Sequence, residues 1–206
     1  MPRIWRTWLS AEPRQFLRNR TMRFLAAGLA MWIGQSIMQM GLPLQGLKLA
    51  DLHDTFNEVR NGHAHEAIDI MAARGTPVQA VVSGTIRKLF LSKPGGNTIY
   101  EFDEAGEYCY YYAHLDRYAD GLREGMRVKR GDIIAYVGST GNADARTPHL
   151  HFAVFELGPK REWWKGKPIN PYPNLVEALK KANDVLLCLP YFLSWPQFRI
   201  QPSIIV

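Results

Sequence analysis

Histidine and aspartate residues in this chain are spaced in ways that could bind a metal ion. His65 and Asp69 lie four residues apart in the sequence His-Glu-Ala-Ile-Asp. In an extended strand they would share one face, because side chains alternate with a period of two. An imidazole nitrogen and a carboxylate oxygen are both good zinc ligands. Such pairs are also common by chance on solvated surfaces, so this one predicts a metal site only together with further ligands.

A second pair, His149 and His151, is separated by one residue in the sequence Pro-His-Leu-His-Phe. In a strand both imidazoles would project to one side, while Leu150 and Phe152 would face the core. One imidazole could ligate a metal ion, and the other could point at a bound water or substrate. The alternative, two surface histidines, does not explain two polar rings on one side of so apolar a strand.

Three further polar residues allow alternative assignments. His114 ends a tyrosine-rich run. A lone histidine at such a place is more often structural than catalytic, so His114 is a candidate site residue only together with the two pairs described above. His63 lies two residues before His65, but only His65 is followed by an aspartate at the required spacing. Glu66 could act as a general base, but a residue adjacent in a strand points to the opposite face.

The sequence from about residue 51 to 174 has the texture of a β protein. Short runs of β-branched and aromatic residues alternate with turn residues. The expected strand segments are residues 76–82, 85–86, 98–102, 107–114, 126–128, 132–137 and 149–156. Closely spaced strands of this kind predict a mainly β, antiparallel sandwich or barrel-like sheet. One helix is expected at residues 175–183, with Asn174 as its N-cap.

The N-terminal residues 1–42 have the pattern of a targeting segment. Arg18, Arg20 and Arg23 precede an apolar run at residues 24–34, which is typical of a signal peptide. The run can be extended to residue 42, a marginal length for a bilayer span, which needs about 20 residues. We expect a basic leader with either a signal peptide or a membrane anchor through residues 24–42. Either one places the body of the protein outside the cytoplasm.

The net charge of +6 does not indicate a nucleic-acid partner. Six arginines and one glutamate in residues 1–23 account for five of these charges, which leaves the remainder nearly neutral. No basic stripe of the kind found in nucleic-acid-binding proteins is left.

The two cysteines, Cys109 and Cys188, are too few for a disulfide framework and lack the spacing of a cysteine zinc site. The apolar tail at residues 185–206 suggests no function.

Several segments together resemble the lysostaphin-type, LytM-like zinc metallopeptidases of the duplicated hybrid motif fold. They are HEAIDI, GTPVQAVVSGTI, YYAHL, GMRVKRGDIIAYVGSTGN and PHLHFAV, in this order within residues 51–174. The resemblance implies one zinc ion held by His65, Asp69 and His151, with a fourth position for water or the scissile carbonyl. It also implies that His114 and His149 are the paired catalytic histidines, without settling which one is the base.

The same resemblance implies a zinc metalloendopeptidase that hydrolyses peptide cross-links in bacterial peptidoglycan, with peptidoglycan stem peptides as its partner. Residues 43–174 would form the LytM-like domain, and residues 175–206 a C-terminal helix and apolar tail. The expected location is the periplasm or cell envelope, with or without an anchor in the inner membrane. The alternative is a non-hydrolytic LytM-like scaffold that activates cell-wall amidases or binds peptidoglycan. The complete set of five site residues favours hydrolysis.

The sequence WWKGKPINPY at residues 163–172 resembles a terminal stretch found in some relatives. Its two tryptophans could line a glycan-binding edge, but structural packing is the more common role of large aromatic side chains. We therefore expect both tryptophans to pack within the domain.

Overall fold

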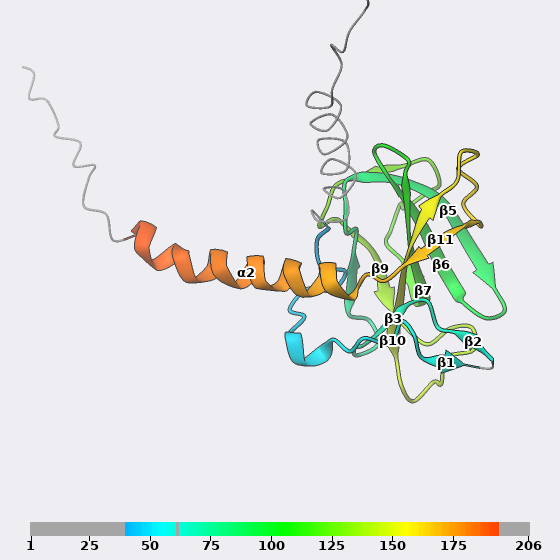
Figure 1. Cartoon of the computed structure of the whole chain (residues 1–206), viewed down its shortest axis with the longest axis horizontal. Helices are drawn as coiled ribbons and strands as arrows, with labels where there is room; N and C mark the ends of the chain where they lie inside the picture. Colours follow the sequence, from blue (N-terminus) through cyan, green and yellow to red (C-terminus); the bar gives the residue numbers. More distant parts are fainter. Residues whose placement is uncertain (1–39, 61, 194–206) are drawn as a thin grey trace, which may run out of the picture. The chain divides into compact units, whose positions relative to one another are not determined.

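The computed structural model describes residues 40–60 and 62–193 of the 206-residue chain (Figure 1). The expected leader up to residue 39 and the end of the tail from residue 194 lie outside the described residues. Within the described ranges, no helix combines the length and the apolar character that crossing a bilayer requires. Met40, Leu44 and Leu47 are buried in the hydrophobic core, so the folded body includes these residues.

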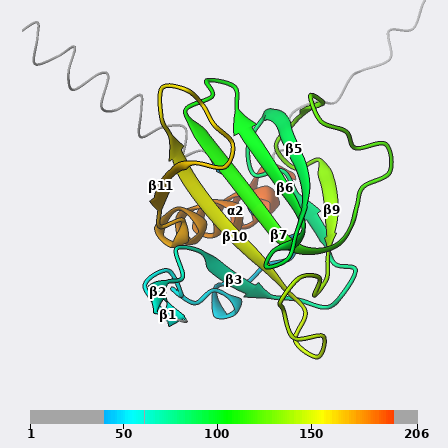
Figure 2. The same cartoon turned by 90° about the vertical axis from the view of Figure 1, so that its right-hand side faces the viewer.

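The described chain is built mainly from antiparallel β-strands, which confirms the expected fold class. The elements are η1 (Leu49–Asp51), β1 (Val59–Arg60), β2 (His63–Ala64), β3 (Ile68–Met71), β4 (Pro77–Gln79), β5 (Gly84–Ser92), β6 (Gly96–Asp103), β7 (Tyr108–Tyr118), β8 (Arg127–Val128), β9 (Ile133–Val137), β10 (His149–Leu157), β11 (Gly166–Ile169) and α2 (Tyr172–Leu193). Strands β1 and β2 form a two-stranded sheet, and the other described strands form a nine-stranded sheet with the central order β11-β10-β7-β6-β5-β8. Figure 2 shows β11, β10, β7, β6 and β5 side by side in this order.

Strand β10 connects three neighbours and so organises the sheet around it. One edge of β10 pairs with β7, and the opposite edge pairs first with β3 and then with β11 (Figure 2). The pairs to β3 involve the first residues of β10, and the pairs to β11 involve the last. This branching places β3 and β7 on either side of the start of β10.

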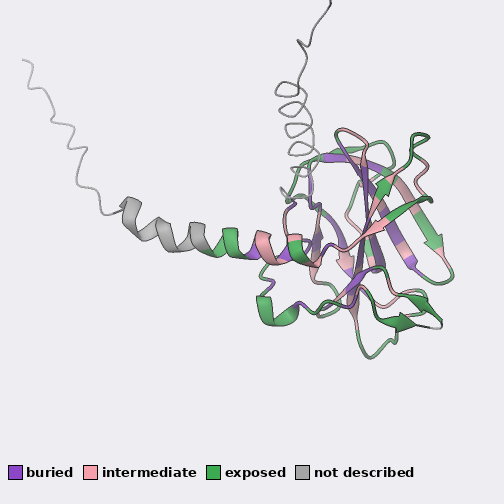
Figure 3. Ribbon diagram, in the orientation of Figure 1, coloured by how far each residue is buried: buried purple, intermediate pink, exposed green. Residues whose placement is uncertain are grey.

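The two faces of β10 differ in burial, as the sequence predicts. Leu150, Phe152 and Val154 are fully buried, whereas His149 and His151 on the other face are half-buried. Figure 3 shows buried residues along the central strands, in contrast to the exposed β1, β2 and η1. Burying one large apolar side chain stabilises a fold by about 1.5–3 kcal/mol relative to leaving it exposed. The three apolar residues therefore fix which way β10 faces, and this direction presents both imidazoles on the face opposite the core.

The predicted strand at residues 76–82 is shorter in the structure, because β4 ends at Gln79. Beyond this point the backbone leaves the strand ladder: Ala80 N donates to Asp132 O at 2.9 Å, and Val81 N donates to Tyr112 Oη at 3.1 Å. Both residues are fully buried. A buried N–H group without a partner would cost about 1–3 kcal/mol, so these contacts replace the ladder bonds.

The predicted start of the C-terminal helix was wrong. Helix α2 begins at Tyr172 rather than after an Asn174 cap, and it continues past the predicted end at residue 183. The Asn170 side chain accepts a hydrogen bond from Tyr172 N at 2.9 Å, which takes up one of the free N–H groups of the first turn. Pro173 is tolerated there because the first helical turn does not need its missing N–H group.

One carboxyl group lies inside the core. Glu101 on β6 is fully buried, and Tyr112 Oη donates to its Oε2 atom at 2.6 Å. Its Oε1 atom has no hydrogen-bond partner among the described residues. Burial raises the pKa of Glu101 to about 8. The side chain is therefore largely a neutral acid at neutral pH.

Glu101 is expected to make stability depend on pH. In the unfolded chain its pKa returns to about 4.5, so the folded state holds an extra proton between this value and about 8. The stabilisation is complete below the unfolded pKa and is lost as pH rises through the folded pKa. Because glutamine does not ionise, Glu101→Gln should lose less stability than the wild type between about pH 5 and pH 9. Denaturant unfolding at several pH values measures the difference, and parallel pH profiles for the two proteins would contradict it.

Candidate metal centre

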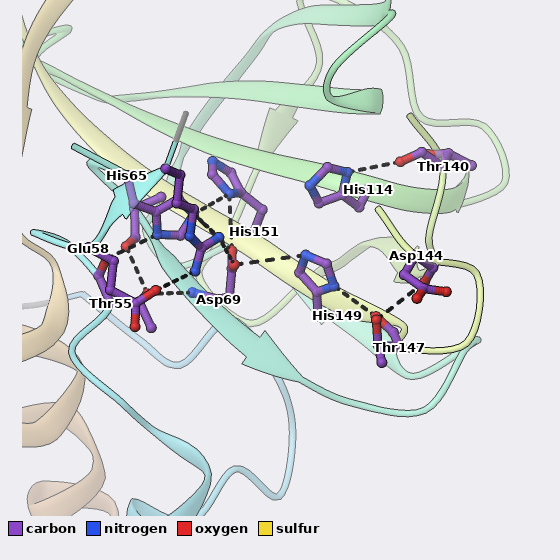
Figure 4. A network of polar contacts seen from close by, with 12 residues as sticks. Thr55, Glu58, His65, Asp69, His114, Thr140, Asp144, Thr147, His149 and His151 are labelled. Atoms are coloured by element: carbon purple, nitrogen blue, oxygen red, sulfur yellow. Dashed lines mark hydrogen bonds and ion pairs between the residues drawn. The ribbon is translucent and has the colours of Figure 1, made fainter. Parts of the chain in front are cut away.

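Three side chains converge beside the start of β10 (Figure 4). The Nε2 atom of His65, the Oδ1 atom of Asp69 and the Nδ1 atom of His151 lie 3.1–3.2 Å from one another. In a tetrahedral zinc site with bonds of about 2.0–2.2 Å, two ligand atoms lie about 3.3–3.6 Å apart. One ion therefore fits between the three atoms with only a small outward shift. Two imidazole nitrogens and one carboxylate oxygen are a donor set that suits zinc.

The pairing of β3 with β10 brings two of the three ligands together. Asp69 lies directly opposite His151 in this antiparallel pair. Directly opposed residues present their side chains on the same face, with their Cβ atoms about 4.5–5.5 Å apart. The neighbouring pair of Ile70 and Leu150 points into the core on the other face. The core packing that orients the strands therefore also aims the two ligands at one point.

The prediction that His65 and Asp69 lie on one strand was wrong, although both side chains reach the centre. Strand β2 ends at Ala64 and β3 begins at Ile68. Between them Glu66 has a φ of 56°, in the left-handed region that a non-glycine residue rarely adopts. This residue turns the chain, so that His65 approaches the centre from outside β3. The Glu66 side chain is exposed, in agreement with the expectation that it points away from the site.

Thr55 orients two of the ligands. His65 Nδ1 donates to the Thr55 carbonyl at 3.1 Å, which leaves the lone pair on His65 Nε2 facing the other ligands. The Thr55 hydroxyl accepts a hydrogen bond from Asp69 N at 3.1 Å and donates to the Ala67 carbonyl at 3.1 Å. Sequence reasoning missed Thr55 because a backbone acceptor leaves no pattern of residue types.

Arg60, at the end of β1, contacts two of the ligands and was also missed. Its Nη1 group donates to Asp69 Oδ2 and lies 2.9 Å from His65 Nε2, while Nη2 donates to Glu58 Oε2 at 2.7 Å. The contact with Asp69 Oδ2 fixes the carboxylate and leaves Oδ1 facing the histidines. The contact with His65 Nε2 uses the lone pair that a metal ion needs, so this contact has to open when an ion binds.

The protonation states of the group are those that bind metal. Burial opposes the charge on Asp69, but its close contacts with His151, His65 and Arg60 outweigh burial and hold the pKa of Asp69 below the usual range. Burial lowers the pKa of His151, which keeps this imidazole neutral. An ionised carboxylate and neutral imidazoles are the forms that act as ligands.

His149 and His114 lie beside the three ligands (Figure 4). The ring centroid of His114 is 4.9 Å from that of His149 and 5.6 Å from that of His151. His149 Nδ1 donates to the Thr147 carbonyl at 2.9 Å, and its Nε2 atom lies 4.0 Å from Asp69 Oδ2. In its neutral form, His149 therefore presents an Nε2 lone pair on the side of the metal group.

His114 reaches the centre from a β-bulge rather than from a regular strand. The register between β6 and β7 shifts between Asn97 and Ile99, and His114 opposite this shift has a φ of 59°. Bulges re-aim side chains and are frequent beside active sites. His114 Nδ1 donates to the Thr140 carbonyl at 2.9 Å, so its Nε2 atom is available as an acceptor. Burial lowers the pKa of His114 to about 4, which keeps the ring neutral.

Close packing holds the carbonyl that orients His114. The Thr140 hydroxyl donates to Leu115 O at 2.8 Å and accepts a hydrogen bond from Asn97 N at 3.0 Å. Gly96, with a φ of 64°, approaches so closely that an added Cβ atom would lie 2.1 Å from Thr140 Oγ1. A glycine is therefore needed at this position, both for its backbone conformation and for the space next to Thr140.

The five residues predicted from the sequence are thus brought together by the fold. His65, Asp69 and His151 form the only group of three or more potential metal ligands among the described residues. The two histidines left out of the predicted site, His53 and His63, are both exposed. The geometry agrees with the choice of His65 over His63.

Residues 63–171 match the family model described as Peptidase family M23, so the chain belongs to this family of zinc peptidases. It is 34% identical over 116 residues to the L-Ala–D-Glu endopeptidase of Bacillus subtilis, covering 54% of this chain and 34% of that protein. It is 33% identical over 107 residues to the peptidoglycan DD-endopeptidase ShyC of Vibrio cholerae, covering 52% of this chain and 23% of that protein. The NMR solution structure of lysostaphin aligns with a TM-score of 0.53 at 30% identity, covering 69% of this chain and 56% of that chain.

These comparisons confirm the resemblance stated from the sequence motifs. They also show that the chain spans only about a third or less of the length of the two curated relatives. The region that matches the family model, residues 63–171, contains all five predicted site residues.

The assignment of the ligands can be tested with two neighbouring histidines. His65→Ala removes a ligand and should abolish stoichiometric zinc binding, because two remaining donors hold the ion poorly. His63→Ala removes an exposed imidazole two residues away and should leave zinc content unchanged. Inductively coupled plasma mass spectrometry on dialysed proteins gives the zinc-to-protein ratio. Equal ratios for the two variants would contradict the assignment of His65.

Proposed function

We propose that this protein is a zinc-dependent endopeptidase that hydrolyses peptide cross-links in bacterial peptidoglycan. The observation that carries the proposal is the convergence of three metal-ligating atoms with two further histidines beside them. Three protein ligands leave a coordination position open, as catalytic zinc requires, whereas structural zinc sites use four protein ligands. The names of the two relatives support the class of bond and, for one of them, the polymer.

His65, Asp69 and His151 would hold the zinc ion. The bound ion would supply a Lewis acid and lower the pKa of a coordinated water molecule. Thr55 and Arg60 fix the orientation of the imidazole and the carboxylate, respectively. Such outer contacts typically change metal affinity or activity by about 10–100-fold when they are removed.

His114 and His149 would move protons at the site. Each ring donates its Nδ1 proton to a backbone carbonyl, so each neutral ring offers an Nε2 lone pair. One ring would accept a proton from the attacking water at its Nε2 atom, and the ring protonated in this way would donate a hydrogen bond to the oxyanion that develops on the scissile carbonyl. The two carbonyl contacts prevent either ring from turning its Nδ1 atom toward the substrate.

A location in the cell envelope is part of the same proposal. The basic residues followed by the apolar run at residues 24–34 support export. Export would bring the peptidase to its polymer, which lies outside the cytoplasmic membrane. Whether the leader is cleaved or remains as a membrane tether is tested by N-terminal sequencing of the mature protein from a cell-envelope fraction. A full-length protein in the cytoplasmic fraction alone would contradict the location.

Hydrolysis is tested with zinc-loaded full-length protein and isolated peptidoglycan sacculi. Soluble muropeptides identified by mass spectrometry should appear with the wild type, and their structures give the bond that is cut. Product should disappear with a chelator and return when zinc is restored. No release by folded, zinc-loaded protein would contradict the proposal and favour the non-hydrolytic scaffold.

Removing either catalytic histidine should separate turnover from metal binding. His114→Ala and His149→Ala should retain zinc, because neither residue belongs to the three-ligand group, but kcat should fall by about 10²–10⁴-fold. His151→Ala should lose both zinc and activity. Zinc content and rates of muropeptide release are measured on the same preparations. Near-normal turnover in His114→Ala and His149→Ala would show that the two rings do not act in proton transfer.

A further inference from the structure

An aromatic pocket lies on the same face of the sheet as the metal centre. Its volume is about 240 Å³, and its walls include Tyr100, Tyr111, Phe155, Trp163, Trp164 and Lys165. The aromatic residues come from β6, β7, β10 and the loop between β10 and β11. These residues, named here the aromatic pocket, are not used by the proposed proton transfers or by the metal group.

The aromatic pocket adjoins the metal centre through the contact of Tyr111 with His151. The ring centroid of Tyr111 is 5.9 Å from that of the ligand His151 and 6.4 Å from that of Phe155. His151 and Phe155 lie on one face of β10, four residues and thus about 13 Å apart along the strand. A bound group in the pocket would therefore lie only a few residues of extended peptide away from a bond held at the metal centre.

One tryptophan of the pocket is packed and the other is presented to solvent. The Trp163 ring lies 5.4 Å from Phe90, 4.8 Å from Tyr100 and 5.3 Å from Trp164, measured between centroids. The expected packing role therefore fits Trp163. The expectation was wrong for Trp164, which remains 63% exposed although it lines the pocket. A large aromatic side chain held at the rim of a pocket is a ready stacking surface.

The chemistry of peptidoglycan indicates which part of the polymer fits here. The bond named for the Bacillus subtilis relative joins alanine to glutamate, and neither residue has a large apolar side chain. Such residues would not fill a pocket walled by five aromatic rings. The other component of the polymer, an N-acetylhexosamine, has a ring with apolar C–H faces and polar edges. Aromatic side chains can cover the apolar faces of the sugar ring, and the Lys165 ammonium can meet its polar edges.

We propose that the aromatic pocket binds an N-acetylhexosamine ring of the glycan strand, with Trp164 as the exposed stacking surface. This inference rests on the proposed function, because it places the sugar of the same polymer beside the peptidase centre. The pocket then selects stem peptides that are still attached to glycan. It directs the metal centre to a bond within the first few residues from the sugar.

Binding is measured first, without hydrolysis. The tetramer of N-acetylglucosamine is titrated into the zinc-loaded full-length protein by isothermal titration calorimetry. Trp164→Ala should raise the Kd by about tenfold or more, and Trp164→Phe should restore part of the affinity because it keeps an aromatic face. Leu91→Ala is the matched control, since Leu91 is 71% exposed and does not line the pocket. Circular dichroism shows whether each variant is folded.

The same variants are then assayed on a stem peptide with and without its N-acetylhexosamine. The wild type should have the lower KM for the sugar-bearing peptide, and Trp164→Ala should raise the KM for that peptide by a larger factor than the KM for the free peptide. Hydrolysis with equal KM values for the two peptides and no binding of the tetramer would overturn the inference and leave the proposed function intact. Tetramer binding that depends on Trp164, with no hydrolysis of either peptide or of sacculi, would support the sugar site and contradict the peptidase.

Discussion

The pairing of β3 with β10 is the interaction on which the rest of the site depends. It places Asp69 opposite His151, while Ile70 and Leu150 in the next pair fill the core. A shift of one residue in this register would move every side chain of β3 to the other face. Both the burial of the apolar residues and the convergence of the two ligands oppose such a shift. Core packing and metal ligation therefore select the same register. A change of register would disrupt both the apolar packing and the convergence of the two ligands.

The remaining polar groups reach the centre through irregular backbone. His65 arrives from a turn at Glu66, and His114 arrives from a bulge in β7, each next to or at a residue with positive φ. Backbone carbonyls of Thr55 and Thr140 then fix the two imidazoles by their Nδ1 atoms. Regular strands thus supply the scaffold, whereas strained positions supply the approach angles. Conformations of this kind cost about 1–3 kcal/mol each and persist where the surroundings hold them.

The alternation of polar and apolar residues made the main features predictable. In β10 the pattern gave the strand, its two faces and the paired histidines, because period two is a property of any extended chain. Residue types and spacing indicated candidate ligands, and the family resemblance selected His65, Asp69 and His151 among them. Because the chain turns at Glu66, however, His65 lies in a loop and Asp69 lies in a strand. The residue preferences of this segment do not predict the turn. Thr55 and Arg60 were missed for a similar reason: their roles depend on long-range contacts, and Thr55 uses its backbone carbonyl.

The predicted start of helix α2 was misplaced because Asn174 is a residue type that often caps helices. In the structure, the side chain that accepts the hydrogen bond from the first helical N–H group belongs to Asn170.

We infer that His65, Asp69 and His151 hold one zinc ion with an open coordination position. Anomalous diffraction from a crystal of the zinc-loaded protein, recorded above and below the zinc absorption edge, locates the ion directly. We predict a single peak about 2.0–2.2 Å from the Nε2 atom of His65, the Oδ1 atom of Asp69 and the Nδ1 atom of His151, with the Arg60 guanidinium displaced from His65 and no fourth protein ligand. A peak bound by other residues, or one closed by a fourth side chain, would contradict it.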